Sequence, residues 1–378
     1  MTDAVPGLAA DRENAFVAYG LPGKPGTDEF WAAAGTPASV PADGGGWVTL
    51  FLWRGSPASI EFESWSEPVP LRRWGDTDCW YAEVRMPARL RVTYRFLTDD
   101  AAYADPFNPV GAGGDRSIAA TPDAPAQPHW PVIGADVVMP LPLTRLRWTS
   151  ERLGGRRTVR VHPVGGGGPV VLLLDGDDWL YLHPAMTAFD SAVASGEMPP
   201  VTLVFLPSKD REAEFACRPD LWEAIRDELL PLVAESGVPC DPDRLVVAGQ
   251  SLGGLSAVYA ALEFPELVSR VACQSGSFWW TPDAMGLADP FGGPLGGAIA
   301  ARLRDRGAAE LAGLRVAFDV GEHETRMLPH CESVEALASE GGAAVRVSRS
   351  PAGHDRAGWR HALLRDVAWV LGAPRGAL

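Results

Sequence analysis

The sequence predicts an α/β protein in which a parallel-rich sheet flanked by helices follows a smaller all-β region. From about residue 157 onward, short apolar runs alternate with segments of helical periodicity, which is typical of parallel strands joined by helices. Between about residues 47 and 97, by contrast, only short β-type runs occur, divided by Gly, Pro and Asp. A Pro-rich stretch from Thr121 to Pro142 is interpreted as a linker, which places the domains at residues 1–142 and 143–378.

The all-β region has the alternation expected of a small antiparallel sandwich. In its last run every second residue from Val92 to Phe96 is apolar, and the residues between them are Thr93 and Arg95. Because successive side chains of a strand point to opposite faces, this spacing predicts one buried face and one polar face. The expected strands are residues 47–53, 59–65, 79–84 and 90–96.

The second region is expected to contribute one strand and one helix in turn. A turn at Asp241-Pro242-Asp243 precedes a continuous apolar run, as expected of a strand buried on both faces. The expected strands are residues 158–161, 170–174, 201–206, 245–248, 268–272, 314–320 and 344–348. The expected helices are residues 220–233, 255–262, 296–305, 327–339 and 357–371.

Composition and charge limit the binding partners and the cellular locations that we expect for the protein. The 378 residues are 46% hydrophobic, which permits sizeable cores, and their net charge of -15 opposes nucleic acid or an anionic membrane as a partner. The amino terminus shows no signal peptide, and no apolar run is long enough to cross a bilayer, so a cytoplasmic location is expected. The five cysteines are scattered and form no metal-binding pattern, so we expect neither a disulfide framework nor a zinc site.

Residues 249–253 read Gly-Gln-Ser-Leu-Gly and lie where the apolar period changes from that of a strand to that of a helix. Such a G-x-S-x-G turn is typical of a nucleophile elbow, whose glycines let strand and helix approach closely while the serine takes a strained conformation. The start of the following helix favours developing negative charge. Ser251 is therefore the predicted nucleophile.

A serine hydroxyl needs a base within hydrogen-bond reach and an acid that orients the base. Enzymes with a nucleophile elbow carry these groups along the chain in the order serine, acid, histidine. His354 is the predicted base, because it lies between the last expected strand and the last expected helix, where a loop can present an imidazole. His330 and His361 lie within helical patterns instead. Asp319, Glu322 and Glu324 compete for the role of the acid, and a Ser-His dyad without an acid stays open.

The oxyanion hole should combine the backbone N–H of Leu252 with one from the loop after strand 170–174, at Gly176 or Asp177. That loop reads Asp175-Gly176-Asp177-Asp178-Trp179. Its carboxylates leave a Mg²⁺ or Ca²⁺ site as an alternative interpretation. We expect no bound metal and no cofactor.

Several motifs resemble the cytoplasmic ferric-enterobactin esterases, also called enterochelin esterases. In the carboxyl-terminal half they are Leu174-Asp175-Gly176, the elbow with its continuation to Ala257, residues 274–280 (QSGSFWW), and Gly353-His354-Asp355 with Trp359-Arg360. In the amino-terminal half they are residues 51–55 (FLWRG), 77–81 (TDCWY) and 105–109 (DPFNP). The resemblance covers nearly the whole chain from about residue 47.

This resemblance implies an immunoglobulin-like domain in front of an α/β hydrolase that cleaves the serine trilactone of a catecholate siderophore, so that its iron is released. The family's acid aligns with Glu324, next to a His323 that stands where the family often has arginine. Residues 211–217 resemble a family segment whose arginine faces the substrate, here Arg211. The iron would travel with the substrate and need no ligand from the protein.

A ferric tris-catecholate is a bulky trianion with flat aromatic faces, so its pocket should combine cations with aromatic walls. Arg211, Arg218, Trp279 and Trp280 are the candidates. Two other functions stay open: a carboxylesterase that acts on feruloyl or acetyl esters of glycans with the same triad, and a siderophore or glycan binder in which Ser251 is unreactive.

Overall fold

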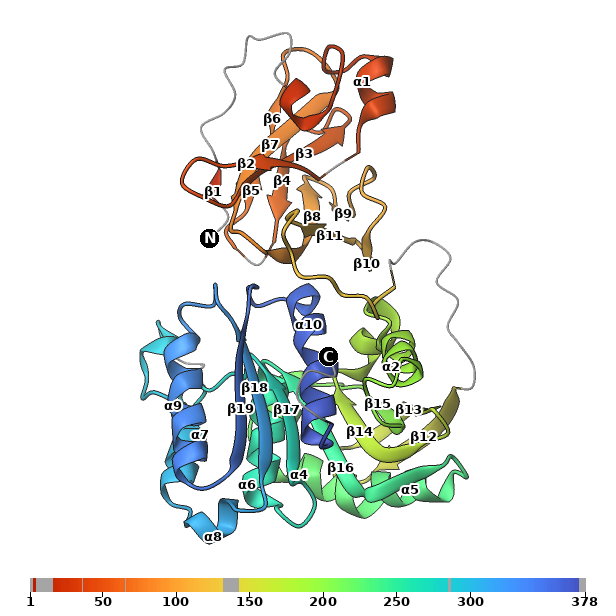
Figure 1. Cartoon of the computed structure of the whole chain (residues 1–378), viewed down its shortest axis with the longest axis vertical. Helices are drawn as coiled ribbons and strands as arrows, with labels where there is room; N and C mark the ends of the chain where they lie inside the picture. Colours follow the sequence, from red (N-terminus) through yellow and green to blue (C-terminus); the bar gives the residue numbers. More distant parts are fainter. Residues whose placement is uncertain are drawn as a thin grey trace. The chain divides into compact units, whose positions relative to one another are not determined.

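The computed structural model describes residues 3–4, 16–35, 37–64, 66–131, 143–284 and 287–373 (Figure 1). The chain divides into two compact units. The described part of the first comprises residues up to Ala126 together with Pro351–Gly358, and the second holds Gln127–Pro131, residues 143–350 and residues 359–373. Half of the expected linker, residues 132–142, lies outside the described residues.

The first unit contains two antiparallel sheets. One has the order β1-β7-β3-β2 with β6 beside β7, and the other has the order β10-β11-β8-β4-β5 with β9 beside β8. The strands of the first sheet are β1 (Asp3–Ala4), β2 (Ala38–Pro41), β3 (Trp47–Arg54), β6 (Arg72–Arg73) and β7 (Cys79–Met86). Those of the second are β4 (Ile60–Glu63), β5 (Val69–Pro70), β8 (Arg91–Thr98), β9 (Ala102–Tyr103), β10 (Gly111–Gly113) and β11 (Arg116–Ala120).

Apolar side chains of both sheets form one shared core. Phe51 of β3 lies 4.3 Å from Phe62 of β4 and 4.9 Å from Tyr94 of β8, measured between ring centroids. Val92, Tyr94 and Phe96 are all buried, so the face predicted to be apolar is confirmed. Burial of aromatic and branched side chains is what stabilises a small two-sheet unit. The short helix α1 (Asp28–Ala33), capped by Thr27, lies between β1 and β2 in the sequence.

A segment distant in sequence completes the first unit. Within Pro351–Gly358, Oδ1 of Asp355 accepts a hydrogen bond of 3.2 Å from the Thr93 N–H, and Oδ2 accepts one from the Thr93 hydroxyl. Ala357 is fully buried in a small cluster with Ala112 and Ile118. Thr93 is consequently buried, although it lies on the face of β8 predicted to be polar.

The second unit is built on an eight-stranded sheet of order β12-β13-β15-β14-β16-β17-β18-β19. The six strands from β15 to β19 in this order are parallel, whereas β12 and β13 are antiparallel. The strands are β12 (Thr144–Ser150), β13 (Gly155–Val164), β14 (Gly168–Leu174), β15 (Val201–Leu206), β16 (Cys240–Gln250), β17 (Arg270–Gln274), β18 (Arg315–Gly321) and β19 (Ala344–Ser350). The predicted parallel-rich sheet is confirmed.

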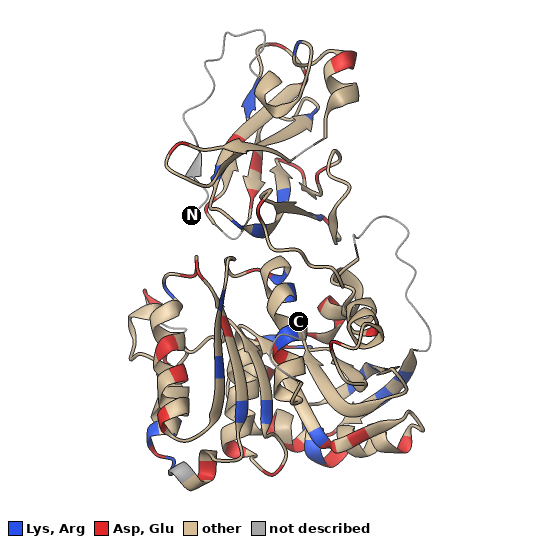
Figure 2. Ribbon diagram, in the orientation of Figure 1, with Lys and Arg blue, Asp and Glu red and all other residues tan. Residues whose placement is uncertain are grey.

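Helices cover both faces of this sheet, and each face has its own buried core (Figure 1). One core includes residues of α4, α5, α6, α7 and α9, and the other includes residues of α2 and α10. The helices are α2 (Ala185–Ala194), α3 (Arg211–Phe215), α4 (Pro219–Ala224), α5 (Leu230–Glu235), α6 (Leu252–Glu263), α7 (Gly297–Arg304), α8 (Ala308–Leu311), α9 (Leu328–Glu340) and α10 (Arg356–Val370). Strands β14 and β15 are tan throughout in Figure 2, as expected for strands covered on both sides.

One local expectation was wrong. The stretch Asp241-Pro242-Asp243 is not a turn but the beginning of β16, because Cys240 and Asp241 pair with Gly168 and Pro169 of β14 before the register shifts. The helix expected over 220–233 is confirmed as a continuous helical stretch over 219–235, in which a π-helical turn, Ile225–Leu229, lies between α4 and α5. Within the described ranges no helix is long and apolar enough to cross a membrane.

Candidate active site

Ser251 lies between β16 and α6, at the strand-to-helix turn that the sequence predicted. Its backbone has φ 55° and ψ -120°, a conformation that costs a non-glycine residue about 1–3 kcal/mol. Strand and helix cross very closely here: a Cβ added to Gly249 would lie 2.2 Å from the carbonyl oxygen of Gly253. Only glycine fits at position 249, as expected for a nucleophile elbow.

The segment after β17 holds the elbow in place. The Ser251 N–H donates to the carbonyl of Gln274 at 3.0 Å, and the Ser277 N–H donates to the carbonyl of Ser251 at 2.9 Å. The Ser251 hydroxyl lies 3.2 Å from the Ser277 hydroxyl. These contacts offset the strain of the turn and fix the direction of the Ser251 side chain.

Gly176, in the loop after β14, is packed too tightly for any other residue. A Cβ there would lie 2.4 Å from the backbone of Phe205 and Leu206, at the end of β15. Asp175, just before it, is buried and has a positive φ of 53°. Asp177 is exposed, and Leu252 is the first residue of α6. The loop and the start of α6 adjoin, because a Cβ on Gly253 would lie 3.5 Å from Cβ of Leu174.

Arg211 makes its hydrogen bonds inside the protein. Its Nε lies 2.9 Å from Oδ1 of Asp175, and its Nη2 lies 3.0 Å from Oδ2 of the same carboxylate. Nη2 also donates to the carbonyl oxygen of Gln250 at 3.1 Å. Arg211 therefore contacts the residue just before Ser251, and its side chain stays 37% exposed.

The three candidate acids have different surroundings. Glu324 is buried, and its Oε1 accepts hydrogen bonds from the Ser275 hydroxyl at 2.5 Å and from the Gly321 N–H at 2.9 Å. Glu322 is exposed. Asp319 is buried within the sheet and accepts hydrogen bonds from three side chains, those of Ser348, Ser350 and Arg365. Hydrogen bonds from Ser275 and Gly321 therefore hold the Glu324 carboxylate in one orientation.

The histidines also differ in their positions. His354 is exposed, in the segment Pro351–Gly358 that belongs to the first unit. His330 is buried in α9, where its Nδ1 accepts the Gly296 N–H at 3.3 Å, so it is a packed helix residue as expected. His361 lies in α10 and is half-buried. Burial lowers the pKa of His323.

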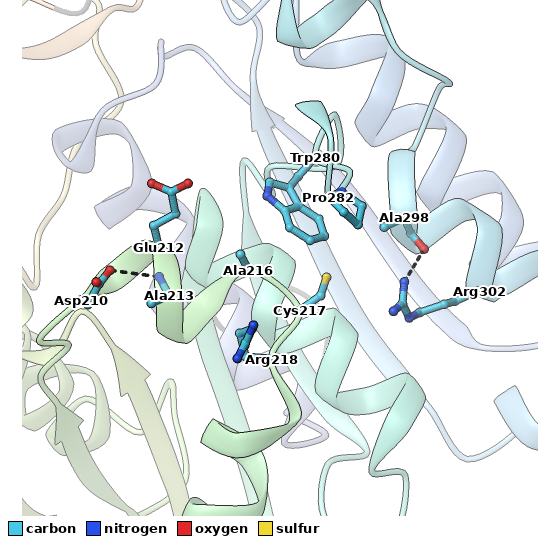
Figure 3. Close-up of a pocket in the computed structure, with 10 residues that line it drawn as sticks. All are labelled: Asp210, Glu212, Ala213, Ala216, Cys217, Arg218, Trp280, Pro282, Ala298 and Arg302. Atoms are coloured by element: carbon cyan, nitrogen blue, oxygen red, sulfur yellow. Dashed lines mark hydrogen bonds between the residues drawn. The ribbon is translucent and has the colours of Figure 1, made fainter. Parts of the chain in front are cut away.

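A pocket of about 640 Å³ lies between α3, α7 and the segment after β17 (Figure 3). Trp280 and Arg218 line it from different segments, together with Cys217 and Arg302. The structure thus brings together two of the four predicted substrate-binding residues. Arg211 and Trp279 are not among its lining residues, and Trp279 contacts Phe291 at 5.2 Å between ring centroids.

Sequence reasoning missed Ser275 and Ser277. Ser275 has φ 48° and is fully buried, its hydroxyl donates to Glu324, and it accepts a hydrogen bond of 2.8 Å from Nε1 of Trp359. The sequence signal was weak: two serines around Gly276 directly after a predicted strand. Burial and a positive φ at a serine cannot be read from such a pattern.

The described residues include no group of three or more His, Cys, Asp or Glu side chains that could hold a metal ion. In the acidic loop, Asp175 is bound by Arg211 and Asp177 lies 3.4 Å from Arg160. The five cysteines are free thiols. Burial raises the pKa of Cys217, which lines the pocket, to about 12.

The elbow and its surroundings agree with a comparison against protein families. A family model named Esterase and described as "Putative esterase" matches residues 150–370, more than half of the 378-residue chain. The chain belongs to this esterase family. The match begins at the end of β12, so it covers the elbow, the loop after β14 and the acids discussed above.

Curated relatives of this esterase match along most of the chain. The iron(III) enterobactin esterase of Dickeya dadantii is 28% identical over 96% of this chain and 98% of its own length. The iron(III) enterobactin esterase of Escherichia coli strain K12 is 28% identical over 91% of this chain and 96% of its own length.

Solved structures give the same result for the fold of this esterase. The enterobactin esterase of Shigella flexneri, solved in the presence of 2,3-di-hydroxy-N-benzoyl-glycine, superposes with a TM-score of 0.76 at 28% identity, covering 91% of this chain and 98% of that one. The ferric enterobactin esterase of Salmonella typhimurium superposes with a TM-score of 0.79 at 25% identity and the same coverage. The fold is therefore the α/β-hydrolase-like fold of esterases.

Proposed function

We propose that this esterase hydrolyses the trilactone of a ferric catecholate siderophore of the enterobactin type, which lets the iron be released. The observation that carries the proposal is the extent of the likeness. The relatives named above match at least 91% of this chain and at least 96% of their own length, so the all-β unit is shared as well as the hydrolase unit. An esterase that shared only the hydrolase fold would match the second unit alone.

In the proposed reaction, His354 removes the proton from the Ser251 hydroxyl as its oxygen attacks a lactone carbonyl carbon. The imidazolium then gives this proton to the departing alkoxide, and an acyl-enzyme remains on Ser251. Water, activated by the neutral imidazole, cleaves the acyl-enzyme and releases the linear trimer. Further rounds on the remaining ester bonds give shorter fragments.

Glu324 is the proposed acid that orients His354. The support for this role is that hydrogen bonds from Ser275 and Gly321 hold the buried Glu324 carboxylate in a fixed orientation at the carboxyl end of β18. Glu322 lacks such burial, and Asp319 is already engaged by Arg365. A fixed carboxylate selects the tautomer of the imidazole and stabilises its charged form.

The developing oxyanion would be bound by the backbone N–H of Leu252 and by that of Gly176 or Asp177. The support for this assignment is positional: Leu252 begins α6, where N–H groups lack helical partners, and the tightly packed Gly176 loop adjoins that helix. Donors held by packed backbone need no rearrangement as charge develops, which is why such sites accelerate acyl transfer.

For the substrate, we propose that Trp280 and Arg218 contact one catecholate arm in the pocket of Figure 3. Arg302, which also lines it, was not predicted from the sequence. An indole face and nearby guanidinium groups suit a flat anionic ring. Iron belongs to the substrate in this proposal, and the enzyme needs no cofactor. The two-sheet unit would be the immunoglobulin-like domain that the sequence motifs imply.

The test is hydrolysis of ferric and iron-free cyclic trilactone, followed by chromatography, with the wild type and Ser251→Ala. We expect the substitution to lower turnover on the order of 10³-fold or more with an unchanged melting temperature, because the half-buried hydroxyl contributes little to packing.

Labelling with a fluorophosphonate provides the control. Ser277→Ala removes the neighbouring hydroxyl, 3.2 Å away, and should still be labelled, whereas Ser251→Ala should not. Labelling of a folded Ser251→Ala protein would exclude this nucleophile. Turnover of methyl ferulate without turnover of trilactone would favour the glycan esterase, and an unlabelled wild type would favour a binding protein.

A further inference from the structure

The Arg211 side chain joins two segments that carry the proposed oxyanion donors. Its guanidinium holds the Asp175 carboxylate through Nε and Nη2, at 2.9 to 3.1 Å, and Asp175 directly precedes Gly176. The same Nη2 donates to the Gln250 carbonyl at 3.1 Å, and Gln250 directly precedes Ser251. One side chain therefore bridges the loop after β14 and the elbow.

A second contact joins the same two segments. Nε1 of Trp179, at the other end of the loop, donates to the side-chain oxygen of Gln250 at 2.8 Å. Trp179 is fully buried, so this end of the loop is fixed by packing as well. The Asp175 end is different, because a positive φ makes it strained and its carboxylate needs a partner to stay buried.

Arg211 itself starts from an anchored element. Helix α3 is short, but Phe215 is fully buried, and Glu214 pairs with the buried Arg157 of β13 at 2.7 Å. Glu214 also accepts the backbone N–H groups of Lys209 and Asp210. The position of the guanidinium is consequently set by the sheet rather than by a mobile loop.

We propose that Arg211 is a positioning residue: by clamping Asp175 to the Gln250 carbonyl, it fixes the loop donor at Gly176 or Asp177 relative to the Leu252 N–H. The inference rests on the proposed function, since it assigns a role within that reaction. It differs from the sequence expectation that Arg211 binds the substrate. A positioning role affects every ester, whereas a contact with a catecholate affects only substrates that carry one.

The experiment compares Arg211→Met with a matched control, Arg349→Met. Arg349 also grips a nearly buried carboxylate with two hydrogen bonds, to Glu335 at 3.0 and 2.7 Å. The exposed fractions match closely: 26% and 7% for Arg349 and Glu335, against 37% and 5% for Arg211 and Asp175. The two variants should lose similar stability, so that a difference in activity reports position and not folding.

On p-nitrophenyl acetate, a neutral ester without a catechol, Arg211→Met should lower kcat on the order of 10- to 100-fold with little change in KM, because a displaced donor acts only in the transition state. Arg349→Met should keep kcat within about twofold of the wild type. The matching thionoester gives a specific readout, since sulfur accepts hydrogen bonds poorly. The rate advantage of the oxoester over the thionoester should shrink in Arg211→Met and stay unchanged in Arg349→Met.

Asp175→Asn is the second variant, in case Arg211→Met does not fold. Asparagine tolerates a positive φ and keeps the shape of the side chain while it removes the charge that Arg211 binds. We expect Asp175→Asn to lower kcat as well. The double variant should lose no more kcat than Arg211→Met alone, because both changes break the same contact. Arg211→Lys should fall between wild type and Arg211→Met, since an ammonium cannot hold both partners.

An unchanged kcat on p-nitrophenyl acetate with a raised KM for the ferric trilactone would overturn the proposal and make Arg211 a substrate-binding residue. A loss of kcat with an unchanged oxoester advantage would also overturn it. If the wild type hydrolyses neither ester, the proposed function itself is contradicted, and this outcome is distinct from the two that overturn the positioning role of Arg211.

Discussion

Glu324 and Glu322 lie two residues apart in very different surroundings. Glu324 is buried and accepts hydrogen bonds from Ser275 and Gly321, whereas Glu322 is exposed. The two residues therefore offer a comparison in which charge and chemistry are the same and only the surroundings change.

We expect Glu324→Gln to lower kcat far more than Glu322→Gln, by about 10²-fold or more, because only an oriented carboxylate can stabilise the imidazolium. The measurement is the steady-state rate on the iron-free trilactone, with the melting temperature of each variant as a control. Equal, near-normal rates would leave a Ser-His dyad as the better description. The reverse order would move the acid to Glu322.

Asp366, in α10, is a fully buried carboxyl group that the proposed reaction does not use. It accepts hydrogen bonds from Gln274 at 2.9 Å and from Arg365 at 3.2 Å, and Arg365 is shared with the buried Asp319. Burial, the largest effect, and the negative charge of Asp319 together raise the pKa of Asp366 from 3.8 to about 6, although the positive charge of Arg365 opposes them.

A carboxyl group whose pKa is raised by folding is favoured in its protonated form, so its contribution to stability is complete below about pH 4 and is lost as the pH rises through about 6. Asp366→Asn cannot ionise. The free energy of unfolding of the wild type should therefore fall relative to that of Asp366→Asn between pH 4 and 7, by about 1–3 kcal/mol. Urea unfolding at several pH values measures this difference, and parallel pH curves would contradict the assignment.

At the scale of single residues, the sequence predicts roles only for residues whose chemistry is tied to a pattern. Ser251 lies in a short motif, and His354 follows the last strand, so chain order was enough to select them. Contacts between segments that are distant in the sequence were harder to find. Ser275 acts through a positive φ and a buried hydrogen bond, and Arg211 contacts Asp175, 36 residues away in sequence. Neither contact leaves a local trace in the sequence.

At the scale of elements, most strands and helices of the second unit were predicted, because apolar runs and helical periodicity are strong where both sides of a sheet are covered. Helix α2 was not among them. The antiparallel strand β12 was missed because its sequence, Thr-Arg-Leu-Arg-Trp-Thr-Ser, is polar and it lies at an edge of the sheet. The start of β16 was mistaken for a turn because local Asp and Pro favour turns, whereas pairing with β14 decides the conformation.

The two glycines of the elbow motif are not equivalent in the packing of β16 against α6. A Cβ on Gly249 would lie 2.2 Å from the Gly253 carbonyl oxygen, which is backbone and cannot move aside. A Cβ on Gly253 would have Leu174 as its nearest contact, at an ordinary 3.5 Å. The strand-helix crossing therefore depends on one glycine of the pair.

We expect Gly249→Ala to lower the melting temperature and to reduce esterase activity by about 10²-fold or more, because the helix must move away from the strand that carries Ser251. Gly253→Ala should stay folded and active, since alanine is favoured over glycine inside a helix by about 0.5–1 kcal/mol. Thermal melts and rates on p-nitrophenyl acetate compare the two. A stable, active Gly249→Ala protein would contradict the packing argument.

At the scale of the whole molecule, charge opposes the proposed substrate. The chain carries a net charge of -15, and a ferric tris-catecholate is a trianion, so the two repel at long range. The Debye length is about 30 Å at 0.01 M salt and about 8 Å at 0.15 M, so added salt confines this repulsion to short distances.

We expect kcat/KM for the ferric trilactone to rise about two- to tenfold between about 0.01 and 0.15 M salt, because encounter is hindered least when the repulsion is screened. The iron-free trilactone, which is uncharged, is the matched control and should change by less than about twofold. A decrease with salt for the ferric complex would show that local cations such as Arg218 and Arg302 dominate its approach.

The contact between Thr93 and Asp355 has a consequence for the order in which the protein is made. These two residues of the first unit lie 262 positions apart, so the segment Pro351–Gly358 is translated long after β8. The strands up to β11 emerge early and can pair with one another. The N–H and hydroxyl of Thr93 in β8, by contrast, gain their acceptor only after residue 355 has been synthesised. Closing so long a loop is slow, so during synthesis the Thr93 amide should exchange its hydrogen with water until the segment Pro351–Gly358 has emerged from the ribosome and packed against β8.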